Sequence, residues 1–348
     1  MNILVTGGAG YLGSVLIPKL IIRGHTVRLL DIGYFGVDHV RSLRKPVELI
    51  REDIRRICQD REFLRDILDN CQCIIHLAAI SNDPCAELCP GLTEDVNFTA
   101  TKNLAEAAKE RGIRFIFSSS CSVYGTTDFE ATEETASHPV TVYAESKVRS
   151  ESAIFALADE RWRPVVLRNG TLFGYSARMR FDLVVNIFSL YSTLYNEIKI
   201  FGDGRQWRPF LHVKDCARAL VYFAELPRPK YTCYNILTEN KQICELASIF
   251  QGINPKLRII HLDMPDPDKR DYRVSNAKMK EEGFIPQLSI EFGAEELVEA
   301  ICSGLIQDPE SIYYRNVKWL KELTEIGKKD YKEIVCLMET LARLRGVY

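Results

Sequence analysis

A glycine-rich loop at the start of the chain constrains the fold more than any other feature. Residues Ile3–Thr6 form an apolar run typical of a buried strand, and the motif GGAGYLG follows before a helical pattern begins. Glycines in this spacing allow a tight turn, a close approach of the backbone to a ligand and close helix–strand packing. The helix N-terminus adds free N–H groups and partial positive charge, so the unit predicts a binding site for the pyrophosphate of a dinucleotide. The residues assigned to it are Gly7, Gly10, Tyr11, Leu12 and Gly13.

An acidic residue, Asp31, stands at the end of the second predicted strand. Its carboxylate would accept hydrogen bonds from the adenosine ribose hydroxyls and repel a 2′-phosphate, which favours NAD over NADP as the cofactor. The alternative is an ordinary turn residue. Asp53 and Ile54, after the third strand, suit a loop that contacts adenine, although Asp53 could equally cap a helix.

Short β-branched runs alternate with longer helical patterns in the first half of the chain. This alternation is typical of an α/β protein with helices on both faces of a parallel sheet, and several strands are apolar throughout, as such burial requires. We therefore expect a Rossmann-type, doubly wound parallel sheet. The expected strands are Asn2–Thr6, Thr26–Leu30, Val47–Ile50, Cys73–Leu77, Arg114–Ser118 and Pro164–Arg168; the expected helices are Leu12–Arg23, Arg61–Asp69, Val96–Arg111 and Val142–Glu160.

The pattern becomes irregular after about residue 170. Loops at 174–180, 202–209 and 264–271 alternate with helices expected at 183–196, 213–225 and 242–251. We predict three parts: a dinucleotide-binding domain at 1–170, a smaller α/β substrate domain at 171–307, and a C-terminal helical extension at 308–348 with helices at 316–327 and 330–345. Segments of the second part could return to the main sheet.

Composition excludes several classes of function. The net charge is −2 and the pI about 6.4, so no bulk electrostatic argument favours nucleic acid or an anionic membrane as a partner. The eleven cysteines include no CxxC pair, so neither a zinc site nor a redox motif is expected. No apolar run reaches the roughly 18 residues of a membrane span. We expect a soluble, cytoplasmic protein with reduced thiols and no metal.

Two residues with the spacing of helical neighbours, Tyr143 and Lys147, suggest chemistry beside the cofactor. They lie four residues apart in the motif YAESK, so both point to one face of a helix. By spacing alone they would more often be surface neighbours. The serine-rich run SSSCSVYG, which starts at Ser118 where a predicted strand ends, and the glycine loop favour the catalytic interpretation.

At this point the chain resembles the extended short-chain dehydrogenases/reductases of the NAD-dependent sugar-nucleotide epimerase/dehydratase family. The resemblance runs from residue 1 to about residue 305. It rests on GGAGYLG, Asp31, the loop at Asp53 and Ile54, and the motifs HLAA, SSSCSVYG, YAESK and RPFLHVKD, in this order.

The resemblance implies a catalytic set of Ser120, Tyr143 and Lys147. Ser120 matches the family's Ser or Thr that hydrogen-bonds the reacting oxygen, and Lys147 also binds the nicotinamide ribose. The further cofactor-lining residues implied in this way are Leu77, Ala78, Ala79, Asn97, Ser118 and Asn169, of which Asn97 could equally be a helix cap.

A tyrosine acting as base needs its pKa lowered. With an ordinary pKa near 10, only about 0.1% of the phenol is ionised at neutral pH. Lowering the pKa by roughly three requires ~4 kcal/mol, much of which the ammonium of Lys147 and the positive nicotinamide ring can supply. Tyr143 would then remove a proton from a sugar hydroxyl while hydride leaves the same carbon.

The substrate implied by the resemblance is a nucleotide-diphosphate sugar. Arg208 and Arg270 match positions at the diphosphate, and an arginine fork suits phosphate oxygens. The segment from Arg178 to Phe181 adds cations to the same pocket. Thr171 replaces a family asparagine, which weakens transfer of the uridine-diphosphate pattern. The residues assigned to substrate are Ser81, Ser120, Cys121, Ser122, Tyr143, Thr171, Arg180, Arg208 and Arg270.

Two residues bear on the type of reaction. Family dehydratases carry an Asp–Glu pair directly after the catalytic Ser or Thr, where this chain has Cys121 and Ser122. Neither replaces an acid and a base convincingly, so dehydration is disfavoured. We expect an epimerase that acts through a transient 4-keto sugar. The alternatives are a nucleotide-sugar ketoreductase or dehydrogenase and, with less support, a non-catalytic NAD-sensing protein.

The resemblance also implies a homodimer. Many relatives pair through the helices that correspond to 96–111 and 142–160, which together form a four-helix bundle. We adopt this as the expected assembly.

Overall fold

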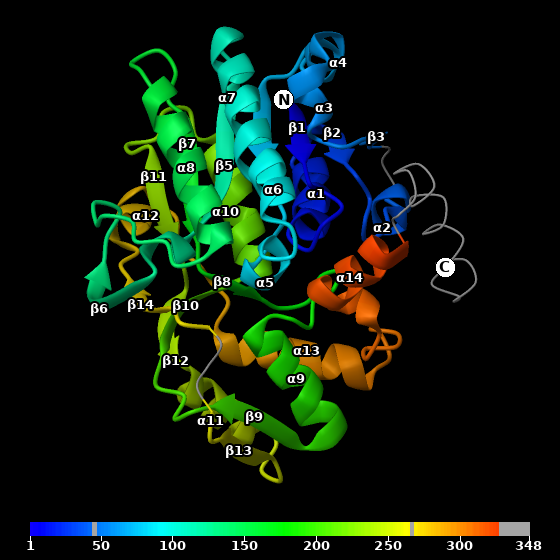
Figure 1. Ribbon diagram of the computed structural model, residues 1–348, viewed down its shortest axis with the longest axis vertical. Coiled ribbons are helices and arrows are strands. Elements are labelled where there is room, and N and C mark those ends of the chain that lie inside the picture. Colours follow the sequence, from blue (N-terminus) through cyan, green and yellow to red (C-terminus); the bar gives the residue numbers. More distant parts are fainter. Residues whose placement is uncertain (44–46, 265–267, 327–348) are drawn as a thin grey trace.

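The centre of the protein is a sheet of seven strands with helices on both sides (Figure 1). The computed structural model describes residues 1–43, 47–264 and 268–326. Every neighbouring pair of strands in the sheet is parallel, which confirms the predicted Rossmann-type sheet. In order across the sheet the strands are β11 (Cys233–Ile236), β7 (Val165–Asn169), β5 (Arg114–Ser120), β4 (Cys73–His76), β1 (Asn2–Thr6), β2 (Thr26–Asp31) and β3 (Glu48–Arg51).

Side chains of the central strands alternate between two cores. Ile3 and Val5 of β1 pack into one cluster with α1 (Gly13–Ile22) and α10 (Val213–Glu225). Leu4 packs into the other, with α7 (Ala100–Glu110) and α8 (Val142–Leu157). Because successive residues of a strand face opposite sides, a strand that is apolar throughout requires cover on both faces. The helices supply that cover.

A smaller layer lies below the carboxyl edge of the sheet (Figure 1). Its core joins α9 (Val184–Tyr195), α11 (Ile243–Ile253) and α13 (Ile290–Cys302) with short strands that pair in twos and threes. Those strands are β8 (Thr171–Phe173), β9 (Glu197–Phe201), β10 (Trp207–His212), β12 (Glu239–Gln242) and β13 (Arg258–Leu262). A further pair, β6 (Thr126–Ala131) and β14 (Asp271–Val274), joins the two halves of the chain.

The remaining elements are short. They are α2 (Asp38–Arg41), α3 (Arg56–Gln59), α4 (Arg61–Ile67), α5 (Asp83–Ala86), α6 (Pro90–Thr93), a π-helical turn (Glu94–Thr99), two 3₁₀ turns (Cys121–Tyr124 and Ile312–Tyr314), α12 (Ala277–Glu281) and α14 (Asn316–Ile326).

The long elements of the first half match their predicted positions to within a few residues. The prediction missed most of the short strands after residue 170, since runs of three to five residues carry little periodicity. Although they follow residue 170, β11 belongs to the main sheet and α10 packs against it. The predicted boundary at residue 170 therefore does not separate the two layers of the structure. The domain boundaries remain a prediction. The helix expected at 330–345 lies outside the described residues.

Candidate active site

One cavity of about 1080 Å³ runs along the carboxyl edge of the sheet and down into the smaller layer. Pockets for single small ligands measure roughly 300–1,000 Å³, so this one is at the upper end of that range. Its upper end is lined by the glycine loop and by Asp31, and its lower end by Arg208 and Arg270. This edge is where parallel α/β sheets bind ligands.

The glycine loop leaves no room for side chains at two positions. Gly7 has a φ of 71°, and a Cβ there would lie 2.6 Å from the backbone nitrogen of Ala78. A Cβ on Gly13 would lie 2.3 Å from the Cα of Gly8. The backbone can therefore approach a pyrophosphate at the start of α1, where free N–H groups and the helix dipole favour an anion. The cradle fits a dinucleotide.

Asp31 lies at the upper end of the cavity, held by two backbone donors. Its carboxylate accepts hydrogen bonds from the N–H of Ala9 at 2.9 Å and of Gly33 at 2.7 Å. Burial raises the pKa of Asp31, and the two backbone bonds oppose that rise. The position fits the predicted ribose contact.

The helix α8 presents Tyr143 and Lys147 to the middle of the cavity. Thr141 caps its N-terminus by accepting a hydrogen bond from the N–H of Ala144 at 3.1 Å. The ammonium of Lys147 lies 5.7 Å from the centre of the Tyr143 ring and donates to the carbonyl of Ser118 at 2.9 Å. The two residues thus share one face of the helix, as their spacing predicts.

The pKa of Tyr143 differs from the expectation. Burial raises it to about 12, and the nearby carboxylate of Asp83 adds to the rise. Arg180, Arg270 and the hydroxyl of Ser120 act in the opposite direction but do not overcome burial. Burial also lowers the pKa of the nearby Lys147 ammonium, to about 8. The polypeptide alone therefore does not supply the predicted lowering.

Ser120, Ser118 and Asn169 line the same part of the cavity. The Ser120 hydroxyl accepts a hydrogen bond from the N–H of Ser122 at 3.2 Å. Asn169 donates to the Ser118 hydroxyl at 2.9 Å.

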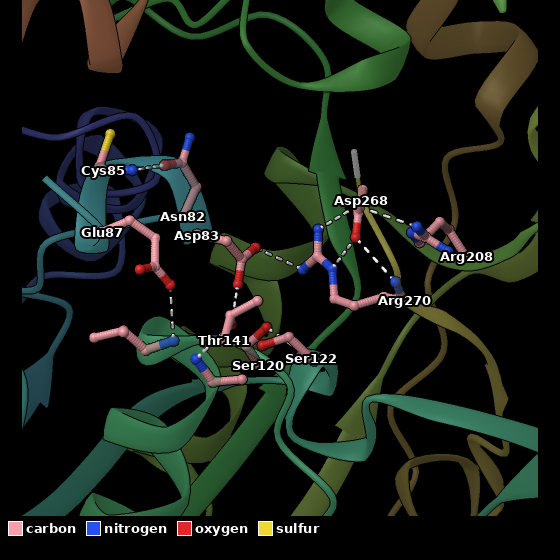
Figure 2. Close-up of polar contacts among 12 residues, drawn as sticks. Asn82, Asp83, Cys85, Glu87, Ser120, Ser122, Thr141, Arg208, Asp268 and Arg270 are labelled. Carbon is pink, nitrogen blue, oxygen red and sulfur yellow. Dashed lines mark hydrogen bonds and ion pairs between the residues drawn. The ribbon is translucent and has the colours of Figure 1, made fainter. Parts of the chain in front are cut away.

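The lower end of the cavity holds two arginines and two carboxylates (Figure 2). Arg270 donates to Asp268 at 2.6 Å and pairs with Asp83 at 2.9 Å, while Arg208 pairs with Asp268 at 3.1 Å. The arginines hold the pKa of Asp268 well below its usual range. Asp83 also accepts a hydrogen bond from the Thr141 hydroxyl, so this network reaches the N-terminal cap of α8.

Most of the predicted site residues line the cavity. Those of the cofactor set that do so are Gly7, Gly10, Tyr11, Leu12, Gly13, Asp31, Asp53, Ile54, Leu77, Ala78, Ala79, Ser118, Tyr143, Lys147 and Asn169; those of the substrate set are Ser81, Ser120, Tyr143, Thr171, Arg180, Arg208 and Arg270. Their roles toward ligands remain predictions.

Three predicted residues lie outside the cavity as the described residues outline it. Asn97 is buried, and its amide is bonded to the backbone of Ile80 and to the Ser146 hydroxyl. Cys121 is fully buried and donates to the carbonyl of Arg168. Ser122 is also fully buried. The strand end turns into a 3₁₀ helix directly after Ser120, which points the next two side chains into the core.

Sequence reasoning missed two groups of residues around the site. The first is Asp83 and Thr141, which approach each other only in the folded chain, although the position of Thr141 just before a helix was a capping signal. The second lies beneath α8: Glu151, one turn beyond Lys147, forms a buried ion pair with Arg168 at 2.7 Å. No local pattern links Glu151 with Arg168, which lies on β7.

Two further observations concern the described residues. No group of three or more His, Cys, Asp or Glu side chains among them is arranged to hold a metal ion. Within the same residues, no helix has the length and apolar character needed to cross a membrane.

Comparison with known proteins agrees with this geometry. A sequence model described as the NAD dependent epimerase/dehydratase family matches residues 3–236. The chain belongs to this family. It is thus an NAD-dependent enzyme, as the glycine loop and Asp31 predict, and NAD is its cofactor.

Individual relatives narrow the chemistry. The chain is 28% identical over 326 residues to UDP-glucuronic acid decarboxylase 1 of Arabidopsis thaliana, which covers 89% of this chain and 72% of that protein. It is similar to the structure of UDP-glucose 4-epimerase from Thermotoga maritima with UDP-glucose (TM-score 0.76, 27% identity, 88% of this chain and 100% of that one). It is also similar to MoeE5 in complex with UDP-glucose and NAD (TM-score 0.71, 26% identity, 88% and 100%). These relatives support NAD-dependent modification of a nucleotide sugar.

Proposed function

We propose that this enzyme is an NAD-dependent epimerase of a nucleotide-diphosphate sugar, acting through a transient 4-keto intermediate. The observation that supports it best is the position of Ser120, Tyr143 and Lys147. They lie where the dinucleotide end of the cavity meets its arginine-lined end. A sugar whose diphosphate lies near Arg208 and Arg270 would reach the nicotinamide beside Tyr143.

In this proposal Tyr143 exchanges a proton with the sugar hydroxyl, and Ser120 holds the same oxygen through its hydroxyl. Bound NAD supplies the hydride acceptor and the positive ring. That positive charge matters because burial alone leaves the pKa of Tyr143 at about 12. Lys147, fixed to the carbonyl of Ser118, keeps a cation close to both the phenol and the cofactor.

The lower arginines would bind the diphosphate. Arg208 and Arg270 are paired with Asp268, and Arg270 also with Asp83. A diphosphate can take the place of the Asp268 carboxylate, since both present oxygens to the same guanidinium forks. Asp83 would then stay on Arg270 and keep the Thr141 cap in place.

The positions after Ser120 argue against dehydration. In addition to lacking carboxylates, Cys121 and Ser122 point into the core and not into the cavity. Burial raises the pKa of the Cys121 thiol well above its usual range, which keeps the thiol protonated and unable to accept a proton. Neither residue supplies the acid–base pair that elimination of water requires.

Cofactor retention separates epimerisation from net oxidation or reduction. Purified protein is incubated without added NAD, in parallel, with UDP-, dTDP-, GDP- and CDP-linked hexoses and with UDP-glucuronic acid. The sugar configuration is followed by NMR and the NADH absorbance band is recorded. We expect inversion at one carbon with no stoichiometric change in absorbance. A stoichiometric change would indicate an oxidoreductase, and loss of carbon dioxide from UDP-glucuronic acid a decarboxylase; either result contradicts the proposal.

We further propose a homodimer formed through α7 and α8, by analogy with the family. The face offered by these helices is polar, with Lys102, Glu106 and Arg149 at its surface. Light scattering after gel filtration tests the assembly, and a monomeric mass would exclude the dimer.

We also propose a cytoplasmic location. The cysteines in the described ranges are free thiols, which suits the reducing cytoplasm.

A further inference from the structure

Arg178 is a buried cation at the cofactor end of the cavity. Its side chain lines the cavity and is only 2% exposed. Among the described residues no carboxylate lies within ion-pair distance of it, and Asp182 and Asp31 attract its charge only at longer range. Its Nε–H, also buried, has no hydrogen-bond partner among them. Burial lowers the pKa of Arg178 to about 10, yet the group stays charged at neutral pH. A buried charge with an open donor is costly unless a ligand completes it.

The neighbours of Arg178 place it beside the cofactor rather than the sugar. Its guanidinium stacks 3.7 Å above the ring of Phe35, which follows β2 and Asp31. Two residues before it, the Ser176 hydroxyl donates to the carbonyl of Tyr11 in the glycine loop at 2.7 Å. Arg178 therefore lies between the glycine loop and the loop after Asp31 that contains Tyr34 and Phe35, which we call the ribose loop. The anionic part of NAD is its diphosphate, and the glycine loop is built to receive that group.

The C-terminal helix α14 holds this arginine in place. Asn316, its first residue, accepts a hydrogen bond from Arg178 Nη2 at 2.5 Å and donates to the Ser81 hydroxyl at 3.3 Å. Asn316 is 3% exposed and lines the cavity together with Val317. These residues lie outside the segment 3–236 that matches the family.

The same helix is docked on the ribose loop. Trp319 Nε1 donates to the carbonyl of Tyr34 at 2.7 Å, and Trp319 and Leu323 are buried against Tyr34 and Phe35. Figure 1 shows α14 beside α2, over the dinucleotide half of the protein. A segment near the end of the chain thus closes the cofactor end of the cavity.

We propose that Arg178, oriented by Asn316 and enclosed by α14, binds the diphosphate of NAD opposite the glycine loop and slows release of the cofactor. This deepens the proposed function, because an epimerase must keep its NAD between turnovers. Binding of nucleotide can be measured without any sugar substrate, so the test does not depend on whether epimerisation is the reaction.

The test uses Arg178→Met, which keeps an unbranched apolar stem and removes the charged guanidinium. Calorimetric titration of nucleotide-free protein with ADP, adenosine and UDP separates the alternatives. Since a hydrogen bond to a charged group contributes about 1.5–3 kcal/mol, we expect ADP binding to weaken about ten- to a hundred-fold. Adenosine and UDP should bind as they do to the unaltered protein. Labelled NAD should exchange faster into the NAD-loaded variant.

Asn316→Ala tests orientation without removing the charge, and Lys318→Ala, at an exposed position on the same helix, is the matched control. We expect faster NAD exchange in Asn316→Ala and an unchanged rate in Lys318→Ala. Circular dichroism verifies folding, and if Arg178→Met does not fold, the Asn316→Ala exchange rate decides. Unchanged ADP affinity in Arg178→Met, an equal loss for adenosine, or a loss for UDP in place of ADP would overturn the assignment.

Discussion

The ammonium of Lys147 donates a hydrogen bond to the backbone carbonyl of Ser118, with 2.9 Å between the two atoms. This bond joins helix α8 to the end of β5. It also keeps the lysine beside the phenol of Tyr143 without a direct bond to it. Both side chains line the cavity.

Tyr143→Phe should remove turnover and preserve NAD binding. Positioned general acid–base groups contribute about 10²–10⁴-fold, so we expect at least a hundred-fold lower kcat. The ring fills the same space, so bound NAD, measured by extraction and chromatography, should stay at its original stoichiometry. Undiminished kcat would exclude Tyr143 as the acid–base group.

Lys147→Met should stabilise the NAD-free protein at neutral pH while it abolishes activity. Burial lowers the pKa of Lys147 from 10.5 to about 8, and the protonated form therefore costs the folded state about 3 kcal/mol at pH 7. The folded protein releases this proton near pH 8, whereas the unfolded chain keeps it until about pH 10.5. Stability of the original protein thus rises with pH across this window.

The advantage of Lys147→Met should accordingly be largest below about pH 8 and shrink toward pH 10. Loss of the charge-assisted bond to the Ser118 carbonyl takes about 1.5–3 kcal/mol from this advantage, so its change with pH is the diagnostic result. Denaturant unfolding at about pH 7 and about pH 10 measures the difference in unfolding free energy between the variant and the original protein. Lys256→Met, at an exposed lysine outside α7 and α8, is the control and should show little change at either pH. An advantage that does not depend on pH would contradict the buried-charge explanation.

Arg270→Met should weaken binding of the nucleotide sugar and leave NAD in place. Arg270 and Asp83 lie at the lower end of the cavity, away from the glycine loop. Loss of a charge-assisted contact to the diphosphate should raise the Kd about ten- to a hundred-fold. Arg205→Met, at a nearby arginine whose side chain is 79% exposed, should leave the Kd unchanged. Equal effects of the two variants would remove Arg270 from the substrate site.

The buried pair of Arg168 and Glu151 should behave as one unit. Their side chains are 6% and 3% exposed, and Glu151 also accepts a hydrogen bond from the Ser119 hydroxyl. Glu151→Met alone leaves a buried guanidinium unpaired, which should cost about 3–5 kcal/mol of unfolding free energy. The double variant with Arg168→Met should lose less than the sum of the two single changes. Additive losses in a double-mutant cycle would show that the pair is not coupled.

The cofactor half of the site could be predicted from the sequence because its signals are local. The glycines at 7, 10 and 13 act through steric contacts within one strand–loop–helix unit, and Asp31 follows at the end of the next strand. Tyr143 and Lys147 share a face through the period of a single helix. Asn97 was placed at the cofactor by resemblance; its backbone partner, Ile80, became visible only in the folded chain.

The tertiary structure alone decided what surrounds these signals. Arg178 and Asn316 are 138 residues apart, and Asp83 and Arg270 come from different layers. No short-range pattern encodes such pairs, since they arise when separately formed elements pack. By itself the sequence determined a strand–loop–helix that holds NAD and a helix that bears a Tyr–Lys pair. Packing decided that a helix near the end of the chain covers the cofactor end of the cavity, because its apolar residues Trp319 and Leu323 leave water only by burial against the ribose loop.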